Sequence, residues 1–110
     1  MKAYVYHAKN PEFRCPPGWV RCTLKDLNDK FDCVATIDLL PEESRDPMDA
    51  LECAYVRTQN GFGSWAMRKD VQARVDSARS TSVGDVVVLE EGEKEEIWAV
   101  APVAFMKLRF

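Results

Sequence analysis

Residues 79–89 read RSTSVGDVVVL, a dense polar loop that runs directly into an apolar strand. Arg79 brings a fixed positive charge with five N–H donors, and three hydroxyl residues follow it. Gly84 can adopt a positive φ, and the carboxylate of Asp85 can hold a turn. The stretch predicts either a structural turn or a binding loop for a carboxylate or phosphate, and residues of this kind serve turns more often.

Apolar runs on both sides of this loop predict an antiparallel sheet. Residues 85–89 and 96–101 are separated by a short segment containing a glycine, which is typical of a β-hairpin. Residues 2–7 and 31–39 alternate between two faces, as half-buried strands do. Trp98 is expected to lie in the core because it stands inside an apolar strand. The strands that we expect cover residues 2–7, 31–39, 85–89, 96–101 and 104–109.

The clearest helix signal begins at Asp46. Asp46 suits the N-cap and Pro47 suits the first helical position, because that position needs no backbone donor. Side chains that could pack against the sheet then recur at helical spacing, namely Met48, Leu51, Tyr55 and Thr58. Asn60-Gly61 predicts a left-handed stop at the end of this helix. A single helical turn capped by Thr23 is also expected earlier in the chain.

Length and composition are those of one ordinary globular domain. The chain has 110 residues, of which 46% are hydrophobic and 30% charged. Together with the elements above, this predicts an α+β fold: a small antiparallel β-sheet with one main α-helix packed on one face, in a single domain spanning residues 1–110. The formal net charge of -3 argues against non-specific DNA binding, which usually needs a basic patch.

The sequence gives no sign of a membrane segment or a secretion signal. No apolar run approaches the ~18 residues of a membrane helix, and the first residues lack the pattern of a signal peptide. We therefore expect a cytoplasmic protein without a membrane partner. The sequence makes no prediction of the oligomeric state.

The four cysteines, Cys15, Cys22, Cys33 and Cys53, are spaced irregularly. The spacings fit neither a CxxC pair nor a zinc finger, so we expect free thiols and no metal site. Cys33 and Cys53 stand among apolar residues and are expected to be buried. On ligand type alone, a site built from His7, Cys15, Cys22 and another cysteine remains an alternative.

No motif for catalysis or for a cofactor accompanies the polar loop. The chain contains no GxGxxG, P-loop or HExxH motif, and no Ser/His/Asp or Cys/His set can be assigned from the sequence. We therefore expect no cofactor, and a binding protein is favoured over an enzyme. Trp65 could anchor a protein interface or seal the core under a long loop. The candidate binding residues are Asn60, Trp65, Arg79, Ser80, Thr81, Ser82 and Asp85.

The second half of the chain resembles small proteins carried by phages, plasmids and bacterial genomes. In these proteins a helix ending near "TN" precedes a tryptophan, an "RSTSVGD" segment, a strand and a closing "APVGF"-like element. The chain also resembles the YodL-like family of mobile-element proteins through its "RS.SV.DVV" core. It departs from the pattern at Gln59, which separates Thr58 from Asn60, and at Ala104, where a glycine is common. The matching pieces are Ala50-Leu51-Glu52, Thr58-Gln59-Asn60, Trp65, residues 79–86 and residues 101–105.

The resemblance implies where such a protein originates and its general role, rather than a particular enzymatic activity. A phage or plasmid setting implies a non-enzymatic accessory protein in a bacterial host cell, which binds a host or phage protein and modulates, for example, a defence system. The alternative is a nucleic-acid or nucleotide-phosphate binding protein. It would use Arg79 and the neighbouring hydroxyl loop, with Arg68, Lys69 and Arg74 as further cations.

Overall fold

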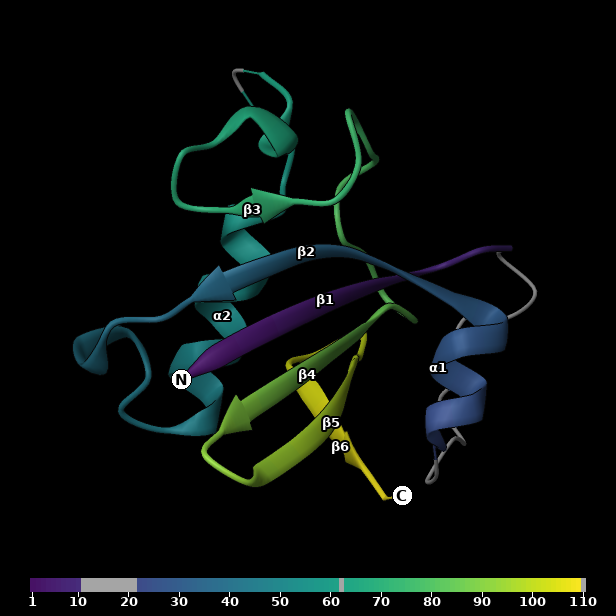
Figure 1. Cartoon of the computed structure of the whole chain (residues 1–110), viewed down its shortest axis with the longest axis vertical. Coiled ribbons are helices and arrows are strands. Elements are labelled where there is room, and N and C mark those ends of the chain that lie inside the picture. Colours follow the sequence, from purple (N-terminus) through teal and green to yellow (C-terminus); the bar gives the residue numbers. More distant parts are fainter. Residues whose placement is uncertain (11–21, 62, 110) are drawn as a thin grey trace.

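A six-stranded antiparallel β-sheet is the framework of the computed structural model, which describes residues 1–10, 22–61 and 63–109 (Figure 1). The strands lie in the order β3-β2-β1-β4-β5-β6, and each pairs with its neighbours in antiparallel fashion. The predicted α+β fold is confirmed. The strands are β1 (Lys2–Ala8), β2 (Phe31–Asp38), β3 (Gln72–Ala73), β4 (Val86–Glu91), β5 (Lys94–Val100) and β6 (Phe105–Leu108). The helices are α1 (Leu24–Lys30) and α2 (Pro47–Arg57), with 3₁₀ turns η2 (Pro41–Glu43) and η3 (Trp65–Met67).

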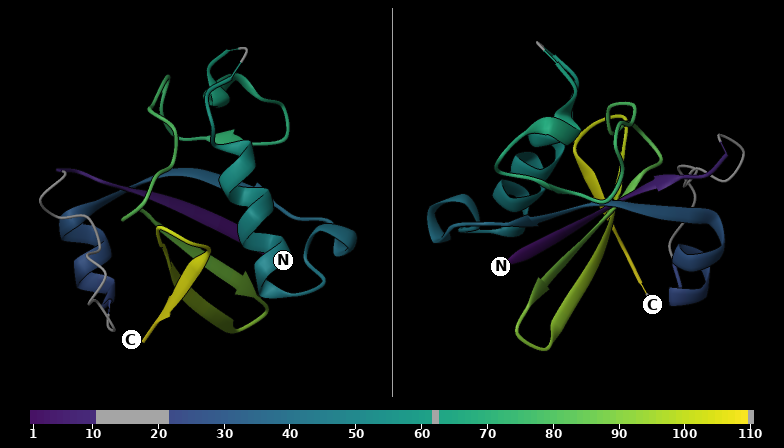
Figure 2. Two further views of the ribbon diagram at one scale, coloured as in Figure 1. Left: turned by 180° about the vertical axis from the view of Figure 1, so that it is seen from behind. Right: turned by 45° about the horizontal axis from the view of Figure 1, so that its top comes forward.

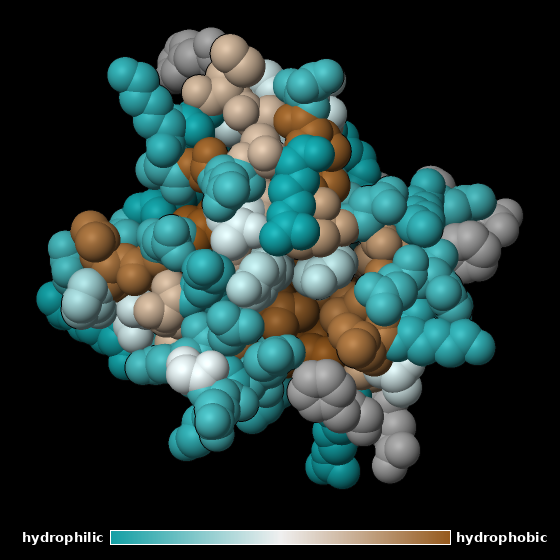
Figure 3. Space-filling model, viewed as in Figure 1, coloured by the Kyte–Doolittle hydropathy of each residue, from teal (hydrophilic) through white to brown (hydrophobic). Residues whose placement is uncertain are grey.

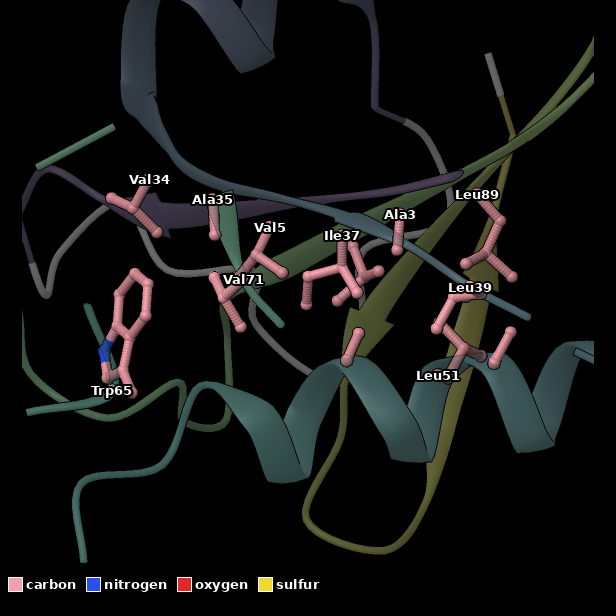
Figure 4. Packing of buried hydrophobic residues seen from close by; sticks show 13 residues of the cluster. Ala3, Val5, Val34, Ala35, Ile37, Leu39, Leu51, Trp65, Val71 and Leu89 are labelled. Atoms are coloured by element: carbon pink, nitrogen blue, oxygen red, sulfur yellow. The ribbon is translucent and has the colours of Figure 1, made fainter. Parts of the chain in front are cut away.

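The main helix, α2, begins as the sequence predicts. The Asp46 carboxylate accepts a hydrogen bond from the backbone N–H of Asp49 at 2.9 Å, and Pro47 occupies the first turn. Ala50, Leu51 and Ala54 are fully buried against the sheet (Figure 4). Burying the Leu51 side chain alone stabilises the fold by about 2 kcal/mol.

The end of α2 differs from the prediction. The helix ends at Arg57, with Thr58 as the C-cap, rather than near Asn60. Among the described glycines only Gly84 and Gly92 have a positive φ, so Gly61 is not a left-handed stop. The Thr58 hydroxyl instead donates to the carbonyl of Ala54 at 2.8 Å, and this bond satisfies a backbone acceptor in the last turn.

A β-bulge in β2 breaks the predicted alternation. Val5 pairs with Ala35, but the next residue of β1 pairs with Cys33, so Val34 is an extra residue in the ladder. Val34 is consequently buried in the core beside Ala35, whereas Cys33 is only half-buried. The expectation of a buried Cys33 is therefore wrong. The same correction applies to Cys53, which is half-buried on α2.

A second, shorter helix covers the other face of the sheet. The turn expected at Thr23 extends through α1, and Thr23 and Asp26 cap its start reciprocally. Leu27 packs with Phe31 and Ile97 in a separate hydrophobic cluster on this face. The two α-helices therefore lie on opposite sides of the sheet (Figure 2). Hydrophilic side chains surround an apolar patch at the centre of the face opposite α2 (Figure 3).

The β4–β5 hairpin is tighter than the sequence suggests, and Trp98 is less buried. Glu91 pairs with Lys94, so the turn consists of Gly92 and Glu93, with Gly92 at a φ of 62°. Ile97 and Ala99 are buried on one face of β5, whereas Trp98 points to the opposite face and is half-buried. The prediction that Trp98 is a core residue is corrected: it packs at the edge of the α2-side cluster.

The β5–β6 turn contains a backbone strain that suggests a simple test. Ala104 has a φ of 60°, a left-handed conformation that costs an L-residue roughly 1–2 kcal/mol. Glycine avoids this cost but loses about 0.4–1 kcal/mol through its freer unfolded chain. We therefore expect Ala104→Gly to raise the free energy of unfolding by about 0.5–1 kcal/mol, measured by urea denaturation. Ala101→Gly, at a position without positive φ, should lower it, and a loss for both variants would contradict the analysis.

Candidate functional site

The polar loop folds around an ion pair between the partly exposed Arg79 and the buried Asp85. The guanidinium donates to both carboxylate oxygens, Nη1 to Oδ2 at 2.6 Å and Nη2 to Oδ1 at 2.7 Å. The Asp85 side chain is fully buried, whereas 38% of the Arg79 side chain is exposed. The backbone N–H groups of Ser82 and Ala8 donate to the same carboxylate at 2.8 Å and 3.1 Å. The geometry is that of the structural turn, one of the two interpretations that the sequence left open.

These contacts set the charge of the buried carboxylate. Burial by itself raises the pKa of Asp85, because it removes water from the charged form. The hydrogen bonds from Arg79, Ser82 and Ala8 outweigh this effect and hold the pKa below its ordinary value. Asp85 is therefore an anion in the folded protein at neutral pH, and it compensates the positive charge of Arg79.

The same ion pair holds a tight turn at residues 82–85. The N–H of Asp85 donates to the carbonyl of Ser82 at 3.0 Å, and Gly84 has the positive φ of 93° that a type II turn requires at its third position. The N–H of Gly84 donates to Val100, which in turn donates to the Asp85 carbonyl, both at 2.9 Å. The turn is thus fastened to β5, and Val83 is left exposed at its tip.

A chain of hydrogen bonds connects the loop to α2 and β1. The Thr58 hydroxyl donates to a carbonyl of α2, and the Thr81 hydroxyl donates to Thr58 Oγ1 at 2.7 Å. His7 Nε2 lies 2.9 Å from Thr81 Oγ1. Each hydroxyl has one proton, and Thr81 already donates its proton to Thr58. The Thr81 oxygen can therefore only accept a hydrogen bond from His7, so Nε2 of His7 must carry a hydrogen. The chain of bonds therefore fixes the protonated nitrogen of His7.

This histidine, hydroxyl and carboxylate do not form an accessible catalytic set. Nε2 of His7 lies 4.0 Å from Oδ2 of Asp85, which superficially resembles the arrangement of a nucleophile, a base and an orienting acid. However, His7, Thr81 and Asp85 are all buried, and the Thr81 proton is already donated to Thr58. The Thr81 hydroxyl therefore joins α2 to β1 as a link in the buried hydrogen-bond chain.

Asn60 and Trp65 complete the network on the far side of the loop. Asn60 donates from its backbone to Ser80 Oγ at 2.8 Å and from its side chain to the Ala78 carbonyl at 2.9 Å. Its Oδ1 accepts from the N–H of Trp65 at 3.0 Å, and the Trp65 indole donates to the carbonyl of Arg79 at 2.9 Å. Trp65 is 1% exposed and points into the cluster (Figure 4). Of its two interpretations, the one in which it seals the core holds.

The candidate residues from the sequence therefore come together in one place, where they bond chiefly to one another and to nearby backbone. Their role in binding a partner stays a prediction. Sequence reasoning missed His7 as a member of this network, although the period of two in β1 places it on the face of Ala3 and Val5. The candidates that the structure brings together are Asn60, Trp65, Arg79, Ser80, Thr81, Ser82 and Asp85.

Two of the four cations of the phosphate-binding alternative, Arg68 and Arg79, are paired with aspartates, whereas Lys69 is exposed and belongs to none of the ion pairs between described residues. Arg68 donates twice to Asp70, with both N–O distances at 2.8 Å, and Arg79 is paired with Asp85. Arg74 contacts the hydroxyl of Thr36 at 3.3 Å. Because Arg68 and Arg79 are each neutralised by an aspartate, they offer little net positive charge to a phosphate.

The described cysteines are free thiols that lie apart from one another. Cys22 is buried, and burial raises the pKa of its thiol to about 11. Among the described residues, no three histidine, cysteine or carboxylate side chains gather where they could hold a metal ion. Cys15 lies outside the described residues, so the alternative site with His7, Cys15 and Cys22 stays a hypothesis.

An apolar groove of about 430 Å³ lies between α2 and the β5–β6 turn. The rings of Tyr55 and Phe105 meet edge to face there, with centroids 6.3 Å apart. Two exposed valines line the groove with these rings: Val56 is 62% exposed and Val83 44%. Val103, 86% exposed, stands in the β5–β6 turn between the lining residues Pro102 and Ala104. Seen from behind, the β5–β6 turn and the end of the polar loop lie beside α2 (Figure 2). Three segments distant in the sequence thus create one apolar surface.

Comparisons of the chain with protein-family models, with curated proteins and with solved structures find no match. None of the helices in the described part of the chain has both the length and the apolar character needed to cross a membrane.

The Arg79–Asp85 pair predicts a large loss of stability when Arg79 is removed. Arg79→Ala leaves a buried carboxylate without its charged partner, and we expect the free energy of unfolding to fall by roughly 2–3 kcal/mol. Arg68→Ala is the matched control, because Arg68 and Asp70 are also bidentate but both about 40% or more exposed. It should cost no more than about 1 kcal/mol in the same urea titration. Equal losses would show that the burial of Asp85 has no effect.

The low pKa of Asp85 predicts acid sensitivity. A free aspartate titrates near about pH 3.9, so below that pH the unfolded chain binds a proton that folded Asp85 still excludes. The stability that Asp85 contributes is present above this pH and is lost as the pH falls through its lower folded pKa. We expect urea unfolding between pH 7 and pH 2 to show a smaller acid-dependent loss for Asp85→Asn than for the wild type. Parallel curves would contradict a depressed pKa.

Proposed function

We propose that this protein acts by binding another protein, as a non-enzymatic accessory protein of a phage or other mobile element in the cytoplasm of a bacterial host. The partner is a host or phage protein, such as a component of a defence system. The mobile-element setting comes from the resemblance carried by the RSTSVGD segment. The observation that supports binding is the exposed apolar groove between α2 and the β5–β6 turn.

The groove has the composition of a protein-docking surface. Aromatic side chains concentrate binding energy in interfaces, and Tyr55 and Phe105 lie at this groove. Fully burying an exposed valine contributes about 1.5 kcal/mol, and the three partly exposed valines together supply roughly 3 kcal/mol. Association itself costs an estimated 4–15 kcal/mol, so the valines alone give weak binding. The partner must therefore also cover the two aromatic rings to bind stably.

The chemistry of the groove favours binding over catalysis. Glu52 is the single carboxylate among the described residues that line it, and no histidine, cysteine or lysine joins it there. General acid–base catalysis needs a positioned acid and base within hydrogen-bond reach of the substrate. His7 and Asp85, the histidine and carboxylate of the network, lie away from the groove and are 5% and 0% exposed.

A double substitution tests the docking surface. Val56→Asp with Val103→Asp places two charges on exposed positions, so the fold should persist while the apolar surface is lost. We expect a protein retained by the tagged wild type from a lysate of the carrier bacterium to fall at least tenfold with the double variant. The purified protein should then bind the wild type, but not the variant, in a calorimetric titration.

Met67→Asp is the matched control, because Met67 is 78% exposed and lies away from the groove lining. This variant should retain the partner as the wild type does. Equal retention by all three proteins would show that the groove is not the docking surface.

A further inference from the structure

The apolar groove has an acidic residue at its rim that no described side chain neutralises. Glu52 lines the groove and is exposed. It stands four residues after Met48 and four before Val56, so the three side chains form one stripe along α2. None of the ion pairs between described residues includes Glu52. A charge in the middle of an exposed apolar stripe is thus available to a partner.

A second carboxylate strengthens the negative field beside this stripe. Asp49 precedes Glu52 by one turn, and both act on the half-buried thiol of Cys53. Burial raises the pKa of Cys53, and the charges of Asp49 and Glu52 raise it further. The basic residue of α2, Arg57, is already paired with Glu43 and with Asp70. The described surface of α2 is therefore apolar and acidic at once.

Building on the proposed function, we infer that the groove binds a partner segment in which an apolar side chain stands close to a lysine or arginine. The apolar side chain fills the space beside Tyr55 and Phe105, and the cation faces Glu52. One helical turn, about 6 Å, separates Glu52 from Val56. The partner's two side chains therefore lie two residues apart in an extended segment, or three to four apart in a helix.

A second copy of this chain is a poor occupant of the groove. In a two-fold symmetric dimer the same patch meets itself, so Glu52 and Asp49 of one copy would approach their counterparts in the other. Like charges at an interface suppress association. The net charge of -3 adds to this repulsion. Charge complementarity selects a basic and apolar segment from another protein.

Selection from a random peptide library displayed on a surface tests this inference. Wild-type protein should enrich peptides that carry leucine, methionine or phenylalanine beside lysine or arginine. Glu52→Lys should lose this preference and bind the enriched peptide at least three- to fivefold more weakly, the effect of one exposed ion pair. Glu93→Lys, the same charge change at the exposed β4–β5 turn, is the control and should select as the wild type does.

The outcomes separate this inference from the proposed function. Peptides that need Val56 and Val103 but show no basic preference would overturn the inference and leave protein binding at the groove intact. If no enriched peptide depends on these valines, both are overturned. Sedimentation that shows a dimer in the wild type, dissociated by Val56→Asp with Val103→Asp, would identify a second copy as the occupant and overturn the basic-segment inference.

Discussion

The buried carboxylate of Asp85 holds together the polar loop at residues 79–85 and its contacts with the rest of the fold. It receives hydrogen bonds from Arg79, from the backbone of Ser82 and from the backbone of Ala8, and so joins the loop, the turn and the end of β1. An anion without these donors would be expensive to bury, since desolvation favours its protonated form. The loop conformation is therefore not free to vary: any alternative that removes Arg79 or the amides leaves Asp85 unsatisfied.

The rest of the network extends this constraint across the molecule. Hydrogen bonds from His7 to Thr81 and from Thr81 to Thr58 connect β1 to the end of α2. Asn60 accepts from the backbone of Trp65, whose indole donates to Arg79, and these bonds connect the polar loop to η3. Each neutral hydrogen bond contributes only about 1 kcal/mol of net stability, but leaving one buried partner unsatisfied costs more. The network consequently specifies one arrangement of the long connection between α2 and β4.

This rigidity also shapes the surface proposed to bind. The turn at residues 82–85 presents Val83, while the β5–β6 turn, with its strained Ala104, presents Val103. Both turns border the apolar groove at α2: the first is fastened to Val100, and the second is closed by a hydrogen bond from the N–H of Ala101 to the carbonyl of Ala104. A preorganised surface loses little conformational entropy on binding, so more of the apolar contact energy appears as affinity. The polar loop and the groove are thus two parts of one arrangement, the first positioning the second.

The sequence by itself determined the elements whose signals are local. The cap at Asp46, the alternation of β1 and the glycine-marked β4–β5 hairpin follow from the preferences of neighbouring residues, and each is present. Tertiary structure decided the rest. The bulge at Val34, the early end of α2 and the half-burial of Trp98 depend on strand register and on packing partners far away in the chain. The grouping of His7 with Asp85, and of Val56 with Val83 and Phe105, joins positions separated by many residues. Local patterns contain no information on such distances, because only the assembled sheet brings these side chains together.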